Sequence, residues 1–187
     1  MTSGASALTT PADAEALVRD NVLLLPVESR PLESLAGAFL AQSVRSERDQ
    51  PPFDRVTMDG IAFASQAWRQ GRRRFRIAGT QAAGYPPLRL VDSADCLEAM
   101  TGAVLPQGCD CVVPVERLRI EHGFAVIDDD TPVEPFLNVH ARGLDAREGD
   151  LLLARGTRLG APELAVLASA GLPRADVRIE PRILIAT

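Results

Sequence analysis

The sequence predicts an α+β fold in which most of the chain is β-structure, and three patterns support this prediction. Near both ends of the chain, apolar residues recur at every third or fourth position, which is typical of amphipathic helices. From Phe53 to about Val139, short β-rich runs are separated by turn residues, which is typical of strands. Residues 182–187 form a continuous apolar run, as in a strand that is buried on both faces of an α/β sheet.

Three helices are predicted from their start and stop signals. The first begins at Pro11, where Thr10 can act as the N-cap and proline is favoured at the first helical position. The second spans residues 31–41, in which apolar residues fall at i, i+3, i+4, i+7 and i+8 and form one stripe. The third spans residues 162–170 and stops before Gly171, because glycine is favoured just after the last helical turn.

The central β region contains several shorter elements. Cys111–Val115 is a β-rich run, and Pro114 within it indicates an edge strand or a bulge, because proline cannot donate a ladder hydrogen bond. Apolar residues on both sides of Glu121-His122-Gly123 predict a hairpin across residues 118–126. Further short strands are predicted at 75–77, 88–90 and 151–154, and a short helix at 93–100 with Asp92 or Ser93 as its cap.

The composition excludes several classes of partner. The 187 residues are 46% hydrophobic and 24% charged, as in ordinary soluble globular proteins. The net charge of −5 opposes binding to a phosphate backbone, and we interpret the five arginines between Arg69 and Arg76 as a solvated face. No stretch reaches the roughly 18 apolar residues of a membrane span, and residues 1–10 lack the features of a secretory signal. We therefore expect a cytoplasmic protein that binds neither nucleic acid nor membrane, with residues 1–10 disordered.

The three cysteines are Cys96, Cys109 and Cys111. An odd number of cysteines in a chain without a secretory signal indicates reduced thiols. Cys109 and Cys111 are separated by one residue, which is neither the usual zinc-ligand spacing nor that of a redox pair. We therefore expect all three side chains to be buried as small hydrophobic groups.

The stretch from Pro51 to Gly60 is the most distinctive candidate site. Its proline pair favours extended backbone, and Asp59-Gly60 is a turn signal because glycine accepts positive φ. That dipeptide alone favours a hairpin turn; the other interpretation is a rigid corner that presents the Asp59 carboxylate beside exposed backbone N–H groups. Two later corners, Thr101-Gly102-Ala103 and Gly143-Leu144-Asp145, carry a hydroxyl group and a second carboxylate.

Three motifs, in this order and with these gaps, resemble a known family. They are Pro-Pro-Phe-Asp and Met-Asp-Gly within residues 51–60, Met-Thr-Gly-Ala followed by Leu-Pro, Val-Val and Glu within residues 100–116, and Gly-x-Asp at 143–145. The family is that of the molybdopterin molybdenumtransferases of the MoeA type, which are related to the E domain of gephyrin. The similarity covers about residues 11–187. The chain departs from the family pattern at Thr57, Ile61, Tyr85, His140 and Leu144.

The resemblance implies a fold like that of the MoeA N-terminal region: an elongated, discontinuous domain with a β-rich domain inserted in it. In the family, the N-terminal helix packs on a later α/β domain that binds molybdopterin, and this chain would end at that domain's first strand. The implied parts are a disordered stretch at 1–10, an N-terminal helix at 11–25, an elongated α/β domain at 26–46 and 145–175, an inserted β-rich domain at 47–144, and the first strand of a truncated molybdopterin-binding domain at 176–187.

The resemblance also implies a reaction, in which molybdate is inserted into the dithiolene of adenylylated molybdopterin with Mg²⁺-dependent loss of AMP, at a site shared across a homodimer. Carboxylates suit the hard Mg²⁺ ion, and backbone N–H groups at tight turns suit an oxyanion. By motif, Asp59 and Asp145 are the expected catalytic acids and metal ligands, and Thr101 is the expected hydroxyl donor. The residues expected to contact the molybdopterin substrate are Gly60, Gly102 and Ala103.

Three interpretations of the function remain open. The first is the N-terminal part of a molybdenum insertase, inactive alone because the pterin pocket is missing. The second is a short family member that acts as a non-catalytic dimerisation or binding module, and the third is an unrelated β-rich binding domain whose motifs match by chance. If the family's site is present, Asp59 and Asp145 should both be exposed on a common surface of the β-rich domain.

Overall fold

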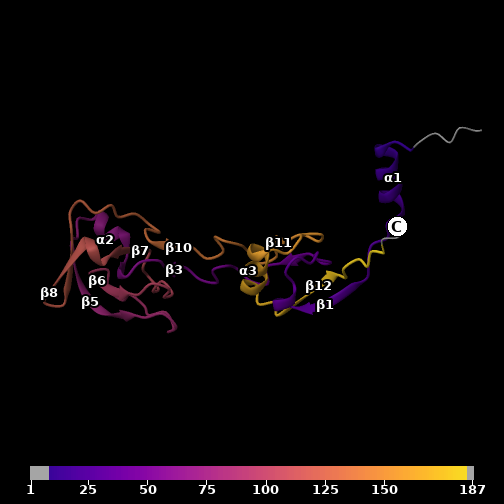
Figure 1. Cartoon of the computed structure of the whole chain (residues 1–187). Helices are drawn as coiled ribbons and strands as arrows, with labels where there is room; N and C mark the ends of the chain where they lie inside the picture. The colour runs from indigo at the N-terminus through magenta and orange to yellow at the C-terminus, as the bar shows by residue number, and fades with distance from the viewer. Residues whose placement is uncertain (1–8, 185–187) are drawn as a thin grey trace, which may run out of the picture. The chain divides into compact units, whose positions relative to one another are not determined.

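The structure is a computed structural model that describes residues 9–184, and its chain divides into two compact units (Figure 1). The first unit combines the two ends of the chain, up to Val44 and from Leu153 onward, and the second contains residues 45–152. The chain passes from one unit to the other within β2 (Val44–Arg45) and again within β11 (Leu151–Leu153). The domain bounds that the resemblance implies, including the truncated molybdopterin-binding domain, stay a prediction.

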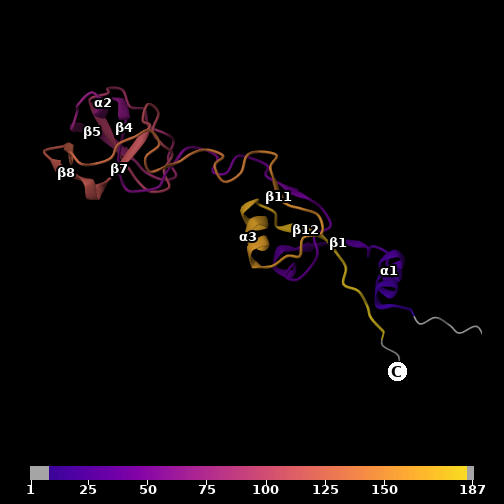
Figure 2. The same cartoon turned by 90° about the horizontal axis from the view of Figure 1, so that it is seen from above.

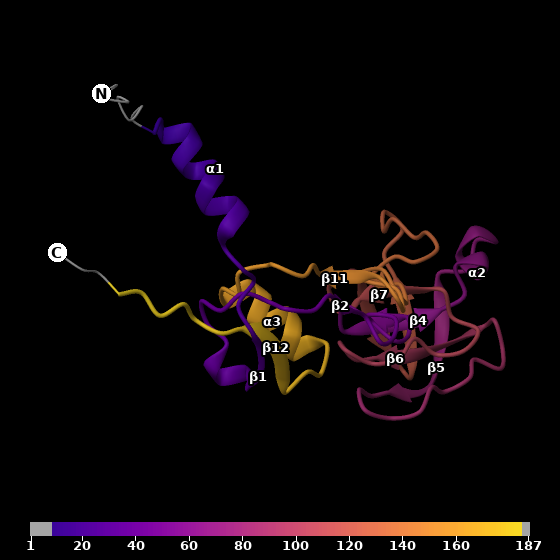
Figure 3. The same ribbon diagram turned by 90° about the vertical axis from the view of Figure 1, so that its right-hand side faces the viewer.

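The first helix forms as the sequence predicts. Helix α1 spans Pro11–Asn21 (indigo in Figure 3), and the Thr10 hydroxyl oxygen accepts a hydrogen bond from the Asp13 backbone N–H at 3.2 Å. It is shorter than the predicted range 11–25 because the backbone becomes extended at Val22. None of its residues is buried. Residues 1–8, where disorder was predicted, lie outside the described part of the chain.

A two-stranded antiparallel sheet and one helix make up the rest of the first unit (Figure 2). Strand β1 (Val27–Pro31) pairs with β12 (Arg174–Arg178). Helix α3 (Ala161–Ser169) matches the helix predicted at 162–170, with Gly171 just beyond its end at φ +76°. The fully buried side chains of this unit come from α3, from β12 and from the segments that precede them: Leu35, Leu40, Leu159, Leu167 and Val177.

The predicted amphipathic helix over residues 31–41 is wrong. Only Leu32–Ser34 form a short 3-10 turn, and Gly37 then takes a left-handed φ of +82° that interrupts any helix. The backbone N–H of Leu40 donates to Thr157 and that of Ala41 donates to Asp176, at 2.9 and 2.8 Å. Tertiary hydrogen bonds therefore replace the helical ones, although the apolar spacing of the segment fits a helix.

The second unit is built on a six-stranded sheet with the strand order β7-β4-β6-β5-β9-β8. Its neighbours are antiparallel except for the parallel pair of β5 and β6. A separate short pair joins β3 (Arg55–Val56) to β10 (Val139–His140), and helix α2 spans Ser65–Arg69. The strands of the large sheet are β4 (Gly60–Phe63), β5 (Arg74–Gln81), β6 (Asp95–Ala99), β7 (Cys111–Pro114), β8 (Leu118–Glu121) and β9 (Phe124–Ile127).

Strand β4 is buried on both faces of this sheet. Ile61 and Phe63 point into one apolar cluster, where the Phe63 and Phe75 ring centroids are 4.5 Å apart. Ala62 points into a second cluster on the opposite face, with Val56 and Leu97. Ile61, which departs from the family pattern, is 1% exposed. That departure therefore changes core packing and does not change the surface.

Several sequence predictions for the second unit are confirmed. Strand β7 is an edge strand, as Pro114 indicated, and β8 and β9 form the predicted hairpin. His122 and Gly123 make its turn with φ of 52° and 80°. Strand β5 contains the predicted strand at 75–77, and β11 matches the one at 151–154.

Other predictions for the chain are wrong. The helix predicted at 93–100 is strand β6, because Asp92 ends the preceding loop in a turn: its carboxylate accepts from the Ala94 N–H at 2.8 Å. The strand predicted at 88–90 is reduced to a single bridge between Arg89 and Gln107. Of the apolar run 182–187, residues 182–184 carry no regular secondary structure, and residues 185–187 lie outside the described part.

The three cysteines are free and buried, as expected. Burial raises the pKa of Cys96 and of Cys109 to about 12, and it raises the pKa of Cys111 further. The thiols therefore stay protonated and pack as small hydrophobic groups. Across residues 9–184, no helix combines the length and the apolar character that crossing a bilayer requires.

A carboxylate and hydroxyl pair at the end of the sheet

Asp59 and Thr101 meet because of the register of two antiparallel strands. Gly60 at the start of β4 pairs with Ala99 at the end of β6, so the residues just outside these strands lie side by side. The Thr101 backbone N–H and hydroxyl group donate to the same oxygen of Asp59, Oδ1, at 2.7 and 2.8 Å. Both residues are exposed. Two of the three predicted catalytic residues therefore form one pair on the surface of the second unit.

These two hydrogen bonds set the charge of Asp59. The Thr101 backbone N–H, and after it the Thr101 hydroxyl group, lowers the pKa of Asp59 from its ordinary value of 3.8, and desolvation, the smallest of the three causes, opposes the change. Asp59 Oδ2 accepts no hydrogen bond from any residue in the described range 9–184. The site thus offers one oriented carboxylate oxygen that is anionic at neutral pH.

Replacing Thr101 by valine is expected to raise the pKa of Asp59 only partway towards 3.8. The hydroxyl donor is lost, but the backbone N–H, which is the larger cause of the shift, remains. Carboxyl carbon NMR titration measures this pKa directly, with Thr101→Ser as the control that keeps the hydroxyl group. An unchanged pKa in Thr101→Val would contradict the hydroxyl bond.

Because folding lowers this pKa, the stabilisation by ionised Asp59 is present above pH 3.8 and is lost as the pH falls through the lowered pKa.

The prediction that Asp59-Gly60 forms a hairpin turn is wrong, while a ligand contact by Gly60 stays a prediction. Gly60 is buried in β4 between two neighbouring strands. A Cβ atom at this position would lie 2.0 Å from the carbonyl oxygen of Val113. A glycine is therefore required at position 60 because the backbone of β7 approaches it closely. Its role is to let β7 pack against the start of β4, next to Asp59.

Gly102 and Ala103 form a turn directly after Thr101, and hydrogen bonds to β3 hold this turn in place. Gly102 has φ of +85°, and its N–H donates to the Val56 carbonyl oxygen at 2.8 Å. Ala103 is fully buried, and its carbonyl oxygen accepts from the Val56 N–H at 2.9 Å. The side chain of Ala103 therefore belongs to the core and its backbone is bound to β3, while its contact with substrate stays a prediction.

Asp145 is exposed on the same unit but does not bond to Asp59 or Thr101. Its Oδ1 lies 2.9 Å from His140 Nε2, and its backbone N–H donates to the Gln50 carbonyl oxygen at 2.9 Å. Strand β3 links the two pairs, because Arg55 is the register partner of His140 and also bridges to Val104, near Thr101. The structure therefore presents two exposed carboxylates near β3, each with its own partner.

Sequence reasoning missed the residues that hold the loop of Asp145 in place. Asp54 Oδ1 accepts from the Arg142 backbone N–H at 2.8 Å, and Asp49 Oδ2 accepts from Arg142 Nε at 2.6 Å. Asp49 Oδ1 accepts from the Glu148 N–H at 3.0 Å; this bond and then that of Arg142 lower the pKa of Asp49. About ninety residues separate these partners, so no local pattern could have shown them. His140 lies only five residues before Asp145, so its closeness in the sequence could have indicated it as the partner of that carboxylate.

A second loop lies beside Thr101. The carboxamide of buried Gln81 accepts from the Leu88 N–H at 2.6 Å and donates towards carbonyl groups of the intervening loop. A Cβ atom at Gly102 would lie 3.8 Å from the Cβ of Ala83 in this loop. The loop carries Tyr85, whose side chain is largely exposed and which departs from the family pattern. Gln81 therefore fixes this loop next to the Asp59–Thr101 pair.

The site fits a magnesium ion only in part. Within residues 9–184, no group of three or more His, Cys, Asp or Glu side chains is placed to hold a metal ion. One oxygen of Asp145 is engaged by His140, while Asp59 has Oδ2 available. Mg²⁺ commonly takes one or two protein carboxylates and completes its shell with phosphate oxygens and water. The residues present therefore fit one carboxylate of such a shell.

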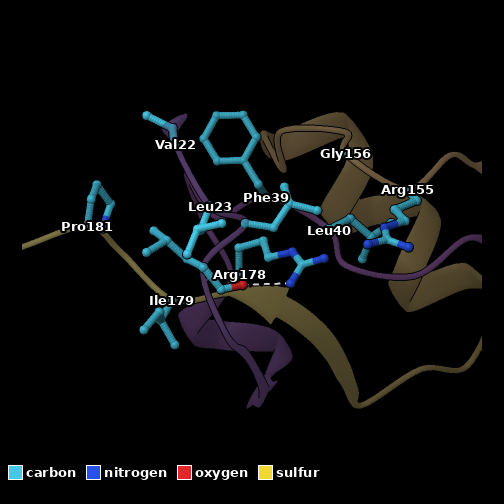
Figure 4. Close-up of a pocket in the computed structure, with 11 residues that line it drawn as sticks. Val22, Leu23, Phe39, Leu40, Arg155, Gly156, Arg178, Ile179 and Pro181 are labelled. Carbon is cyan, nitrogen blue, oxygen red and sulfur yellow. Dashed lines mark hydrogen bonds between the residues drawn. The ribbon is translucent and has the colours of Figure 1, made fainter. Parts of the chain in front are cut away.

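A separate apolar hollow occurs in the first unit (Figure 4). It has a volume of about 400 Å³ and is lined mainly by aliphatic and aromatic carbon, from Leu23, Phe39, Leu40 and Ile179 among others. Arg178 crosses its floor and donates to the Leu25 carbonyl oxygen at 2.6 Å. No carboxylate lines it. It suits an apolar surface and does not contain the predicted site residues.

Comparison with known proteins gives one consistent family. A molybdopterin molybdenumtransferase from Synechocystis is 42% identical over 149 residues, which are 80% of this chain and 38% of that protein. The protein of the same name from Haemophilus influenzae is 30% identical over 141 residues, 75% of this chain and 34% of that protein. The chain therefore spans less than half the length of these relatives.

Solved structures show the same likeness. A molybdopterin biosynthesis MoeA protein from Pyrococcus horikoshii superposes with a TM-score of 0.83 at 27% identity, over 91% of this chain and 46% of that one. A second structure of a MoeA protein from this organism gives 0.77 at 29% identity. The family model described as the MoeA N-terminal region (domain I and II) matches residues 9–171. With the fold, the motif order and this match in agreement, the chain belongs to the family of the MoeA N-terminal region.

Proposed function

We propose that this chain is the N-terminal part of a molybdopterin molybdenumtransferase, which transfers molybdate into adenylylated molybdopterin during molybdenum cofactor biosynthesis. The observation that carries the proposal is the Asp59–Thr101 pair, in which two strands of the sheet orient a carboxylate on the surface. The pair lies in the motifs that the family shares. Because the match covers 38% and 34% of the two relatives, the proposal concerns the activity of a protein of their length.

In this proposal Thr101 is a positioning residue. Its hydroxyl hydrogen is already donated to Asp59 Oδ1, so it is not available to an oxyanion. Asp59 is anionic and would repel the molybdate dianion at close range. Asp59 therefore acts towards a cation or a proton, and Thr101 keeps its carboxylate aimed and ionised. This revises the expectation that Thr101 is itself the donor to substrate.

We infer that Asp59 contributes one oxygen to a Mg²⁺ ion, the other ligands coming from substrate phosphate and water. When bound, such an ion neutralises phosphate charge and so assists loss of AMP. Asp145, whose second oxygen is not engaged by His140, is the second proposed carboxylate of the site. It faces solvent from a loop that Asp49 and Asp54 hold in place.

We further propose that the chain works as part of a homodimer in the cytoplasm. Large apolar side chains of the first unit, such as Leu23 at 85% and Leu24 at 77% exposure, need cover in a stable protein. In the longer relatives, additional chain or a second subunit would supply that cover. Buried, free cysteines agree with a reducing compartment.

A chimera tests the proposed function. Residues 9–171 of this chain would replace the matching region of the Synechocystis relative, in a bacterial strain that lacks its own molybdenumtransferase. We expect the chimera to restore the activity of a molybdenum enzyme in that strain. A folded, abundant chimera that restores none would overturn the proposal and favour a non-catalytic binding module.

A further inference from the structure

A basic pocket lies on the outer face of the six-stranded sheet, at β5. It has a volume of about 390 Å³ and is lined by Arg72, Arg74, Arg76, Asp92, Ala94, Asp95 and Phe124. From the sequence alone, this arginine run was interpreted as a solvated face. The proposed function makes no use of it, since neither Asp59 nor Thr101 lines the pocket.

The register of three strands builds the pocket. Residues two apart on a strand point to the same face, so Arg74 and Arg76 point outward while Phe75 between them is fully buried. Arg76 is the register partner of Asp95 on β6 and of Phe124 on β9. The pocket therefore arises from side chains placed opposite one another on three neighbouring strands.

Two of the guanidinium groups are held in fixed orientations. Arg76 Nε and Nη2 donate to the two oxygens of Asp95 at 2.9 and 2.7 Å, a bidentate pair. The guanidinium of Arg74 lies 3.5 Å from the centre of the Phe124 ring and stacks on it. A stacked or paired guanidinium loses less conformational entropy when it binds a ligand, because its position is already set.

The arginines of this pocket have N–H donors that are available to a ligand. Neither Arg72 nor Arg74 makes an ion pair with any residue from 9 to 184, and Arg76 keeps one terminal nitrogen unused. Arg73, which points to the other side, is instead occupied by the Trp68 ring and by Asp129. Both oxygens of Asp95 serve Arg76, and one oxygen of Asp92 accepts from the Ala94 N–H. The pocket thus carries a positive excess in a chain of net charge −5.

We propose that this pocket binds the phosphate group of a small molecule, either inorganic phosphate or a phosphate monoester such as a nucleoside monophosphate. Planar guanidinium groups match phosphate oxygens in pairs. The volume lies within the range of small-molecule sites. The outer face of the Arg74 guanidinium offers a stacking surface for a base, which inorganic phosphate would not use.

Isothermal titration of the full chain with inorganic phosphate and, separately, with AMP tests the proposal. We expect dissociation constants in the millimolar range or tighter, with AMP binding more tightly if the ligand is a nucleotide and equal binding if it is free phosphate. Arg72→Ala combined with Arg74→Ala should weaken binding about tenfold or more, because two charge-assisted donors are lost. Asp92→Asn should strengthen it, since it removes a negative charge from the lining and keeps the acceptor for Ala94.

Arg119→Ala is the matched control, because Arg119 is an exposed arginine on β8 of the same sheet that does not line the pocket. It should leave the affinity unchanged. Circular dichroism melting of each variant separates loss of binding from loss of folding. Absence of binding by both ligands, or equal weakening by Arg119→Ala and the double variant, would overturn the proposal. Neither result would bear on the transferase function, which is tested by the chimera.

Discussion

Replacing Asp59 by alanine is expected to lower the transfer activity of the chimera by about 100-fold or more, which is the usual cost of removing a charged group that acts in the transition state. Its stability should change little, because Asp59 is exposed and, among residues 9–184, its carboxylate forms hydrogen bonds with Thr101 alone. Cofactor formation in the complemented strain measures the activity, and thermal melting of the purified protein measures the stability. The combination of lost activity and retained folding is what separates a site residue from a structural one.

Asp128→Ala is the control for this experiment, because Asp128 is another carboxylate of the second unit and makes an ion pair with Arg119 at 3.7 Å. It should leave transfer unchanged. The transfer activity of Thr101→Val should lie between those of Asp59→Ala and Asp128→Ala, since this change removes one of the two donors that orient Asp59 and keeps the other. Full activity of the Asp59→Ala chimera would exclude Asp59 from the reaction.

Replacing Gly60 by alanine is expected to destabilise the second unit by about 3 kcal/mol or more, through overpacking of a fully formed sheet. The added Cβ atom would lie 2.0 Å from the Val113 carbonyl oxygen and 2.8 Å from its carbonyl carbon. Backbone atoms cannot rotate away as a side chain can, so β4 and β7 would have to separate. Urea denaturation of the isolated chain, followed by circular dichroism, measures the change in the free energy of unfolding.

Gly79 provides the matched control, because it is also a strand glycine of the same sheet. A Cβ atom there would meet only side-chain atoms, the nearest being Leu97 Cδ2 at 3.5 Å. Gly79→Ala should therefore change the unfolding free energy by no more than about 1 kcal/mol in either direction. Equal effects at the two positions would contradict the close approach seen at Gly60.

Local sequence signals predicted those elements whose start and stop lie in the chain itself. Helix α1 has its cap at Thr10, helix α3 ends before Gly171, and the β8–β9 hairpin turns at His122-Gly123. The segment 31–41 was misjudged because its hydrogen-bond partners, Thr157 and Asp176, lie more than a hundred residues away. Periodicity shows which residues are buried, but it does not show with which segment their backbone pairs.

The sequence likewise predicted only part of the candidate site. Motif order identified Asp59 and Thr101, and strand register then explains why residues 42 apart in the chain share one hydrogen-bonded pair. Gly60 was expected to contact a ligand because it lies in the family motif. Its role in close packing depends on β7, which the sequence did not place next to β4. The Asp49–Arg142 bond has no sequence signal at all.

The most direct test of the transferase proposal is the rate of AMP release by the purified chimera from adenylylated molybdopterin, measured with and without molybdate. We predict molybdate-dependent release at a rate within about tenfold of the Synechocystis relative, with almost none in the Asp59→Ala chimera. A folded chimera whose AMP release is no faster than that of the relative lacking its N-terminal region would contradict the assignment of this chain as the N-terminal part of a molybdenumtransferase.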